Sequence, residues 1–220
     1  MATATLEATA QLRDGVAALD SYAQRDLAAL WAQVQTSAEA GEALHDILPA
    51  LIATYGIAAS ALASDWYEDL RDKVGVTGRF VTLPADFADV GAHALVAWAG
   101  NTATDLTGFR QLVQGGTQRR IANFARQTVM DTSVRDPKAA GWQRVGVGDS
   151  CPFCTMLNSR GFVYSSATAT FGAHDNDDCV AVPAFGGLAT PVDAYKPTDR
   201  RITDRDRARV RAWLRDNPQS

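Results

Sequence analysis

The chain has 220 residues, of which 46% are hydrophobic and 21% charged, with a formal net charge of −4. This composition is ordinary for a globular chain of one or two domains and excludes a low-complexity or disordered chain. The N-terminus shows no basic region followed by an apolar run, and no apolar stretch of about 18 residues stands out. We therefore expect neither a signal peptide nor a membrane span.

The first third of the chain is predicted to be helical. Apolar residues recur at three- and four-residue steps from Leu12 to Val34, which predicts one amphipathic helix. A second helical run follows Ser37, and Pro49 inside it is expected to kink or divide it. A third helix is predicted over residues 58–70.

The middle of the chain continues the helical pattern after a predicted loop over residues 73–84. Helices are predicted over 85–99, 104–113 and 117–132, with the last two separated by a break at Gly115–Gly116. Free helical stripes, especially Leu12 to Val34, are candidates for packing on other subunits instead of on the protein's own core.

The pattern changes after Asp136–Pro137, which is expected to end the last of these helices. Short strands are predicted over 142–148, 161–165 and 179–183, and an amphipathic helix over 203–215. The expected fold class is α+β and predominantly α. Its three parts are a helical body (1–138), a β-containing module (139–190), and a linker with a basic C-terminal helix (191–220).

All three cysteines and one of three histidines lie within 29 residues. Cys151, Cys154, His174 and Cys179 have the spacing C-x2-C…H-x4-C, in which two thiolates and a more distant His and Cys can complete a tetrahedron around Zn²⁺. Four protein ligands would make the site structural and not catalytic. Asp177 is a competing oxygen donor that can substitute for one ligand.

Catalytic interpretations of the cysteines have weaker support. Cys151-Pro-Phe-Cys154 is also a redox-active dithiol pattern of the glutaredoxin kind. The glutaredoxin fold, however, places this motif directly after a buried strand, near the start of a βαβ domain. A zinc deaminase would need a His-x-Glu that precedes the cysteine pair, and it is missing here. Nucleophile elbows, phosphate-binding glycine loops and His-Glu-x-x-His motifs are also missing from the sequence. We therefore expect a protein that is not an enzyme and takes no small-molecule substrate.

Several sequence motifs together resemble one known family. They are Gly141-Trp-Gln-Arg-Val145, Cys151-Pro-Phe-Cys-Thr-Met-Leu-Asn-Ser-Arg-Gly-Phe-Val-Tyr164, His174, and Cys179-Val-Ala-Val-Pro-Ala-Phe185. The chain resembles the MuF-like minor head proteins of actinobacterial phages and prophages, over roughly residues 40–186. Members of this family commonly have a Cys-x-Cys before the final strand. Here Asp177 stands in the place of the first cysteine and Cys179 matches the second.

The resemblance implies a structural role. MuF-like proteins are low-copy components of the procapsid interior that associate with the portal and act in head assembly and in genome packaging or delivery. It therefore implies contact with the portal or the major capsid protein, a location inside the virion head, and the host cytoplasm during assembly.

The C-terminal segment offers a second kind of contact. Seven arginines lie within residues 200–215, and a basic helix face can meet DNA phosphate. Arg205, Arg209 and Trp213 are the candidate contacts with packaged DNA or with a head protein. For this helix, the alternative is a solvated, ion-paired face without a partner. For the whole protein, the alternative functions are a DNA-binding zinc module and a thiol oxidoreductase.

Overall fold

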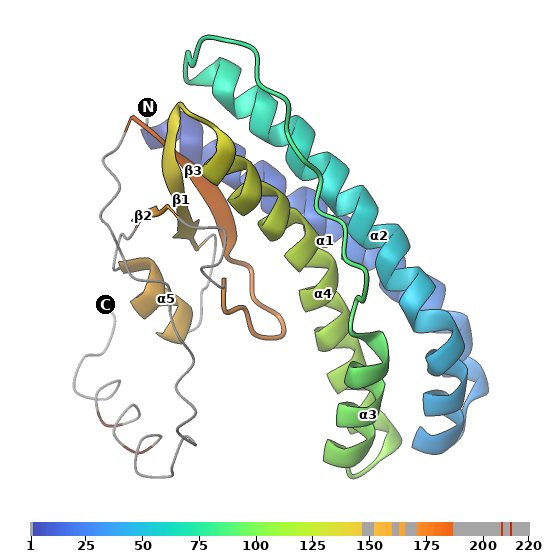
Figure 1. The fold of residues 1–220 in the computed structure, drawn as a ribbon. Helices are drawn as coiled ribbons and strands as arrows, with labels where there is room; N and C mark the ends of the chain where they lie inside the picture. The colour runs from blue at the N-terminus through green and yellow to red at the C-terminus, as the bar shows by residue number, and fades with distance from the viewer. Residues whose placement is uncertain are drawn as a thin grey trace.

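The computed structural model describes residues 2–146, 152–159, 163–165 and 171–186, together with Ala208 and Ala212. Four helices form the body (Figure 1): α1 (Ala2–Gln33), α2 (Ser37–Lys73), α3 (Ala92–Thr102) and α4 (Leu106–Arg135). They are followed by β1 (Ala139–Val145), α5 (Pro152–Ser159), β2 (Val163–Tyr164) and β3 (Val180–Phe185). The expected fold class, α+β and predominantly α, is confirmed.

The apolar stripe of α1 is buried against the protein itself. Leu12, Val16, Ala23 and Leu27 are buried in one core with residues of α2 and α4, while Leu19, Leu30 and Val34 are partly buried against it. The expectation that this stripe is free for other subunits is therefore wrong. Packing of an apolar stripe against the rest of the same protein is the usual source of helix stability.

Helix α2 runs unbroken through Pro49, where the sequence predicted a kink or a division. Proline removes the backbone N–H that would bond to the carbonyl of residue 45. In the structure the His45 carbonyl oxygen is met by His93 Nε2 of α3 at 3.1 Å, so the orphaned acceptor has a partner. The helix begins with a capping box, in which Thr36 and Glu39 satisfy each other's free backbone N–H groups.

By length and composition alone, helix α2 is long and apolar enough to cross a membrane, although the sequence was expected to contain no membrane span. It contains an 18-residue window with a mean hydropathy of 1.7, and 44% of that window is buried inside the protein. A mostly buried helix in the core of a protein can be equally long and apolar. The buried face of α2, which includes Leu44, Leu48 and Ile52, belongs to the hydrophobic core.

Residues 74–91 form an extended strap along α2 and α4, and the helix predicted from residue 85 begins only at Ala92. The strap's backbone is held by side chains of the two helices it crosses. The hydroxyl of Ser60 donates to Ala85 O at 2.7 Å, and Ala85 N donates to Thr128 Oγ1 at 2.9 Å. These tertiary bonds replace the helical ones, and Gly91, with φ 66°, forms the turn into α3.

Helix α4 continues through Gly115–Gly116, where a break was predicted. Both glycines are sites of close approach: an added Cβ at Gly116 would lie 2.3 Å from a methyl carbon of Leu95 in α3. The pair therefore allows α3 and the loop before β3 to approach α4, and it does not end the helix. Asp136 caps the helix end as expected.

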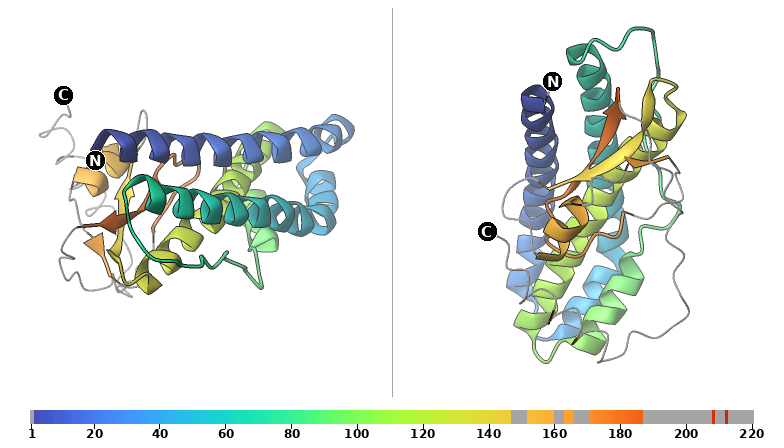
Figure 2. Two further views of the ribbon diagram at one scale, coloured as in Figure 1. Left: turned by 90° about the horizontal axis from the view of Figure 1, so that it is seen from above. Right: turned by 90° about the vertical axis from the view of Figure 1, so that its left-hand side faces the viewer.

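The sheet lies at the end of the bundle where α1 begins and α2 ends (Figure 2). Its order is β2-β1-β3 with both pairs antiparallel, and Trp142 of β1 pairs with Tyr164 and Pro183. The three short strands were predicted, whereas α5 was not. Trp142 and Val180 to Val182 share the hydrophobic core of the helices, so the sheet is packed on the body by apolar burial.

Candidate metal centre

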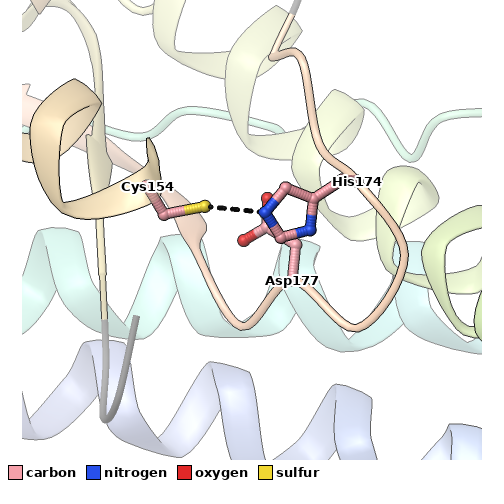
Figure 3. Close-up of side chains that lie close together, drawn as sticks. All are labelled: Cys154, His174 and Asp177. Atoms are coloured by element: carbon pink, nitrogen blue, oxygen red, sulfur yellow. Dashed lines mark hydrogen bonds between the residues drawn. The ribbon is translucent and has the colours of Figure 1, made fainter. Parts of the chain in front are cut away.

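Three potential metal-ligating side chains meet between α5 and the loop that precedes β3. The ligand atoms of Cys154, His174 and Asp177 all lie within 4.8 Å of one another (Figure 3). Cys154 Sγ is 3.4 Å from His174 Nε2. Cys154 and Asp177 are buried, and His174 is half-buried.

The chemistry of the group fits a shared metal ion. A tetrahedral ion with bonds of about 2.3 Å to sulfur and about 2.0–2.1 Å to nitrogen places these two atoms about 3.6 Å apart, close to the 3.4 Å seen between Cys154 and His174. His174 Nδ1 lies 2.9 Å from the Asp175 carbonyl oxygen. A carbonyl only accepts, so Nδ1 donates in this contact, and a neutral imidazole would then present the lone pair of Nε2 toward Cys154.

Asp177 contributes a buried carboxylate. Its Oδ1 accepts a hydrogen bond from Cys179 N at 2.8 Å, whereas Oδ2 has no hydrogen-bond partner among the residues that the structure describes. Such a group is unusual, because buried polar atoms are almost always hydrogen-bonded. Oδ2 faces the guanidinium group of Arg144 and is the carboxylate oxygen that could also meet a bound cation.

Two buried arginines also act on Asp177. Arg126 Nη2 is 3.9 Å from Oδ1, and Arg144 Nη2 is 3.6 Å from Oδ2. Burial raises the pKa of Asp177, but the hydrogen bond from Cys179 N and the charges of Arg126 and Arg144 outweigh burial and lower its pKa overall. The carboxylate is therefore ionised, as a metal ligand must be. Its charge is already partly balanced by the two guanidinium groups.

Arg126 ties the loop to α4. Its Nε donates to Cys179 O at 3.0 Å and its Nη2 to Asp177 O at 2.6 Å. Burial lowers the pKa of Arg126 to about 10, against the opposing effect of Asp177. The ring of Phe171 lies against the guanidinium groups of both Arg126 and Arg144, 4.9 Å and 4.0 Å from their central carbons.

Helix α4 fixes the turn that carries His174. Asn176 has the left-handed φ of 60°, and its N–H donates to Gln118 Oε1 at 3.2 Å. Asp175 pairs with Arg119 at 3.2 Å. The turn lies against Gly115, where an added Cβ would be 3.0 Å from Asp175 Cβ. A side chain at that position of α4 would push the turn away.

Cys179 lies beside the group but outside it. The thiol is buried, and its Sγ is 3.6 Å from Asn158 Nδ2 of α5. Burial raises the pKa of Cys179, and the nearby Asp177 charge raises it further, against the opposing hydrogen bond from Asn158. A raised pKa favours the neutral thiol, which is the opposite of what a reactive cysteine needs.

The structure brings some of the predicted site residues together and does not describe others. Cys154, His174 and the alternative ligand Asp177 are brought together, and Cys179 lies near them against Asn158. Cys151, Arg205, Arg209 and Trp213 lie outside the described residues, so their roles stay predictions.

Four residues that support the group were not predicted from the sequence: Arg126, Arg144, Asn158 and Phe171. Arg126 gave a usable signal, because it directly follows the inward-facing Phe124 and Ala125 of a predicted helix. A charged residue on or beside a buried face needs a buried partner. The others gave none, because their proximity arises only from the tertiary fold.

Fold and site together define a helical-bundle protein with a small antiparallel sheet and a Cys–His–Asp group that can hold a metal ion. Residues 3–201 match the family of VG15 proteins. The chain belongs to this family, which consists of phage and viral gene products. Comparisons with curated proteins and with solved structures find no match.

Proposed function

We propose that this protein is a MuF-like minor head protein of a tailed phage or prophage, located inside the head and associated with the portal. Its membership in a phage and viral family over residues 3–201 is the observation that carries the proposal. The sequence resemblance to MuF-like proteins supplies the more specific role in head morphogenesis and in genome packaging or delivery. The protein acts by binding portal or capsid protein and not by catalysis.

A nonsense mutation in the gene tests this role during phage growth. We expect DNA replication and lysis to proceed, while the yield of filled, infectious heads falls, and a plasmid copy of the gene restores it. Normal numbers of infectious particles without the protein, or a block before head assembly such as failed DNA replication, would contradict the proposal.

We propose that the metal is zinc and that its role is structural. The ligands are drawn from Cys151, Cys154, His174 and Cys179, with Asp177 in place of one of them. Sulfur and imidazole donors favour zinc over hard cations such as Mg²⁺ or Ca²⁺. When bound, such an ion would link α5 to the loop before β3.

Elemental mass spectrometry of protein purified without added metal tests this assignment. We expect about one zinc per chain, with thiols that react only after chelation. In variants that circular dichroism shows to be folded, loss of zinc in Asp177→Asn but not in Cys179→Ser would favour the aspartate as the ligand, and the reverse would favour the cysteine. The exposed neighbour in Asp178→Asn is the matched control. Metal-free protein with freely reactive thiols would refute the zinc site.

A further inference from the structure

A groove lies between α3, α4 and the loop that carries His174. It consists of two hollows of about 470 Å³ and about 570 Å³, which share Arg119 and Arg120 in their walls. The second hollow is completed by the following residues: Ala94, Leu95, Trp98, His174 and Asp175. Neither Cys154 nor Asp177 lines either hollow.

The two arginines are held in place while keeping donors for a ligand. Arg120 donates through Nε to Gly91 O at 3.1 Å and through Nη1 to Gly116 O at 3.0 Å. Arg119 is fixed through its Nε, 3.2 Å from Asp175 Oδ1. The remaining N–H groups of both make no hydrogen bond to any described residue. Pre-positioned guanidinium groups with free N–H edges match the oxygens of a phosphate.

The charge balance at the groove is slightly positive in an acidic protein. The second hollow holds Arg119 and Arg120 against Asp175 alone, whereas the whole chain has a formal net charge of −4. Asp89 faces Arg120 from the first hollow, but its Oδ1 accepts from Gly91 N at 2.7 Å. Binding of an anion here is therefore expected to be modest and sensitive to salt.

Trp98 adds an aromatic surface to the same hollow. It lies on the α3 face that lines the groove, and 46% of it is exposed. A large exposed aromatic side chain is costly to leave in water and often marks a binding surface. Proteins that bind single-stranded nucleic acid combine aromatic side chains, on which bases stack, with a positively charged groove that follows the backbone.

We propose that this groove binds single-stranded nucleic acid, with Arg119 and Arg120 on phosphate groups and Trp98 stacked on a base. A duplex would fit poorly, because its bases are paired and stacked within the helix and do not expose a face to Trp98. The inference rests on groove residues alone and does not depend on the proposed role in the phage head.

Fluorescence anisotropy with a labelled oligothymidylate and the full-length chain tests the groove. In low salt we expect binding that weakens as salt rises, with a slope of about 0.7 per phosphate contact. Trp98→Ala and Arg119→Gln should each raise Kd about tenfold, the scale of one stacked base or one charged contact. Arg79→Gln and Tyr22→Ala, at exposed positions outside the groove, should leave Kd unchanged.

Circular dichroism of each variant separates loss of binding from loss of fold. The inference would be overturned by no oligonucleotide binding in low salt, by groove variants that bind like wild type, or by a duplex of equal length that binds more tightly. The second of these would place the contact elsewhere, for example on the arginines of residues 200–215. Equal affinity for thymidine monophosphate would assign the groove to free nucleotides and also overturn the proposed occupant.

Discussion

Asp177 joins the candidate metal centre to the buried charge cluster that supports it. Only 2% of the residue is exposed, and it faces Arg126 and Arg144. A buried pair of this kind adds little net stability compared with apolar packing, but removing one partner leaves charge uncompensated in a low-dielectric interior. The loop's position therefore depends on this carboxylate with or without a bound ion.

We predict that Asp177→Asn destabilises the protein by about 3–5 kcal/mol, because two buried guanidinium groups lose their counter-charge. The neighbouring Asp178→Asn removes an exposed carboxylate and should change stability by no more than about 0.5 kcal/mol. Urea unfolding of both variants in the presence of chelator separates this effect from metal binding. Equal stability of the two variants would show that the charge cluster is unimportant.

The contribution of Asp20 on α1 to folding stability should depend on pH. Burial raises its pKa, against the opposing hydrogen bond from Gln24 Nε2 at 3.0 Å. A carboxyl with a raised folded-state pKa favours folding when protonated, below its unfolded value of about 3.9, and this contribution is lost as pH rises through the folded pKa. At neutral pH the ionised Asp20 therefore costs stability.

Asp20→Asn should accordingly be more stable than wild type at neutral pH, by less than about 1 kcal/mol. The difference should shrink as the pH falls toward about 4, where wild-type Asp20 becomes protonated. Urea unfolding at several pH values measures this trend. A gain that does not vary with pH, or a loss at neutral pH, would show that ionisation of Asp20 is not the cause.

At the level of elements, the long helices are fixed by contacts that a sequence pattern does not reveal. Gly56 of α2 meets the ring of Phe124 of α4, where an added Cβ would lie 2.4 Å from the ring. That ring is also held edge-to-face by Phe87 of the strap, with centroids 4.6 Å apart. The α2–α4 packing therefore requires a residue without a side chain at position 56.

Two glycine substitutions on α2 should have opposite effects. Gly56→Ala should destabilise the protein by about 1–3 kcal/mol, because the new methyl group overlaps Phe124. Gly41→Ala should stabilise it by up to about 1 kcal/mol through helix propensity, because its Cβ would meet only Val96 Cγ1 at 3.8 Å. The unfolding temperatures of the two variants, each compared with that of the wild type, test these expectations. A stabilising Gly56→Ala would mean that the two helices do not pack so closely.

The sequence predicted element types better than element boundaries. Periodicity located the helical body and the three strands, because both patterns reflect burial of one face. Because proline and glycine usually interrupt helices, Pro49 and Gly115–Gly116 predict helix breaks that the structure does not show. In the structure His93 meets the carbonyl that Pro49 leaves free, and the glycines sit at close contacts. These partners are remote in sequence, so no local pattern could reveal them.

The same limit applies to the candidate site. Cys154 and His174 were predicted from ligand type and spacing, and Asp177 was recognised as an alternative donor. Arg144 comes from β1, where it meets both Asp177 and the ring of Phe171 from the loop, and these contacts depend on how the sheet packs on α4. Spacing can therefore predict a set of ligands, but not the residues that fix their charge and orientation.

At the scale of the whole molecule, the helical body should be stable whether or not a metal is bound, because most of the core residues lie in α1, α2, α3 and α4. We predict that Cys154→Ser, or removal of metal by a chelator, leaves helical circular dichroism almost unchanged. Hydrogen exchange in residues 152–159 and 171–179 should become faster at the same time. Unchanged protection in both segments would show that no ion holds them together.

The most direct test of the proposed function is the location of the protein in purified phage heads. Quantitative mass spectrometry of protease-treated heads, before and after they are opened, measures copy number and accessibility together. We predict a few copies per head, relative to the major capsid protein, which resist protease until the head is opened and then co-purify with the portal. Absence from heads, or complete digestion while they are closed, would contradict an internal head protein.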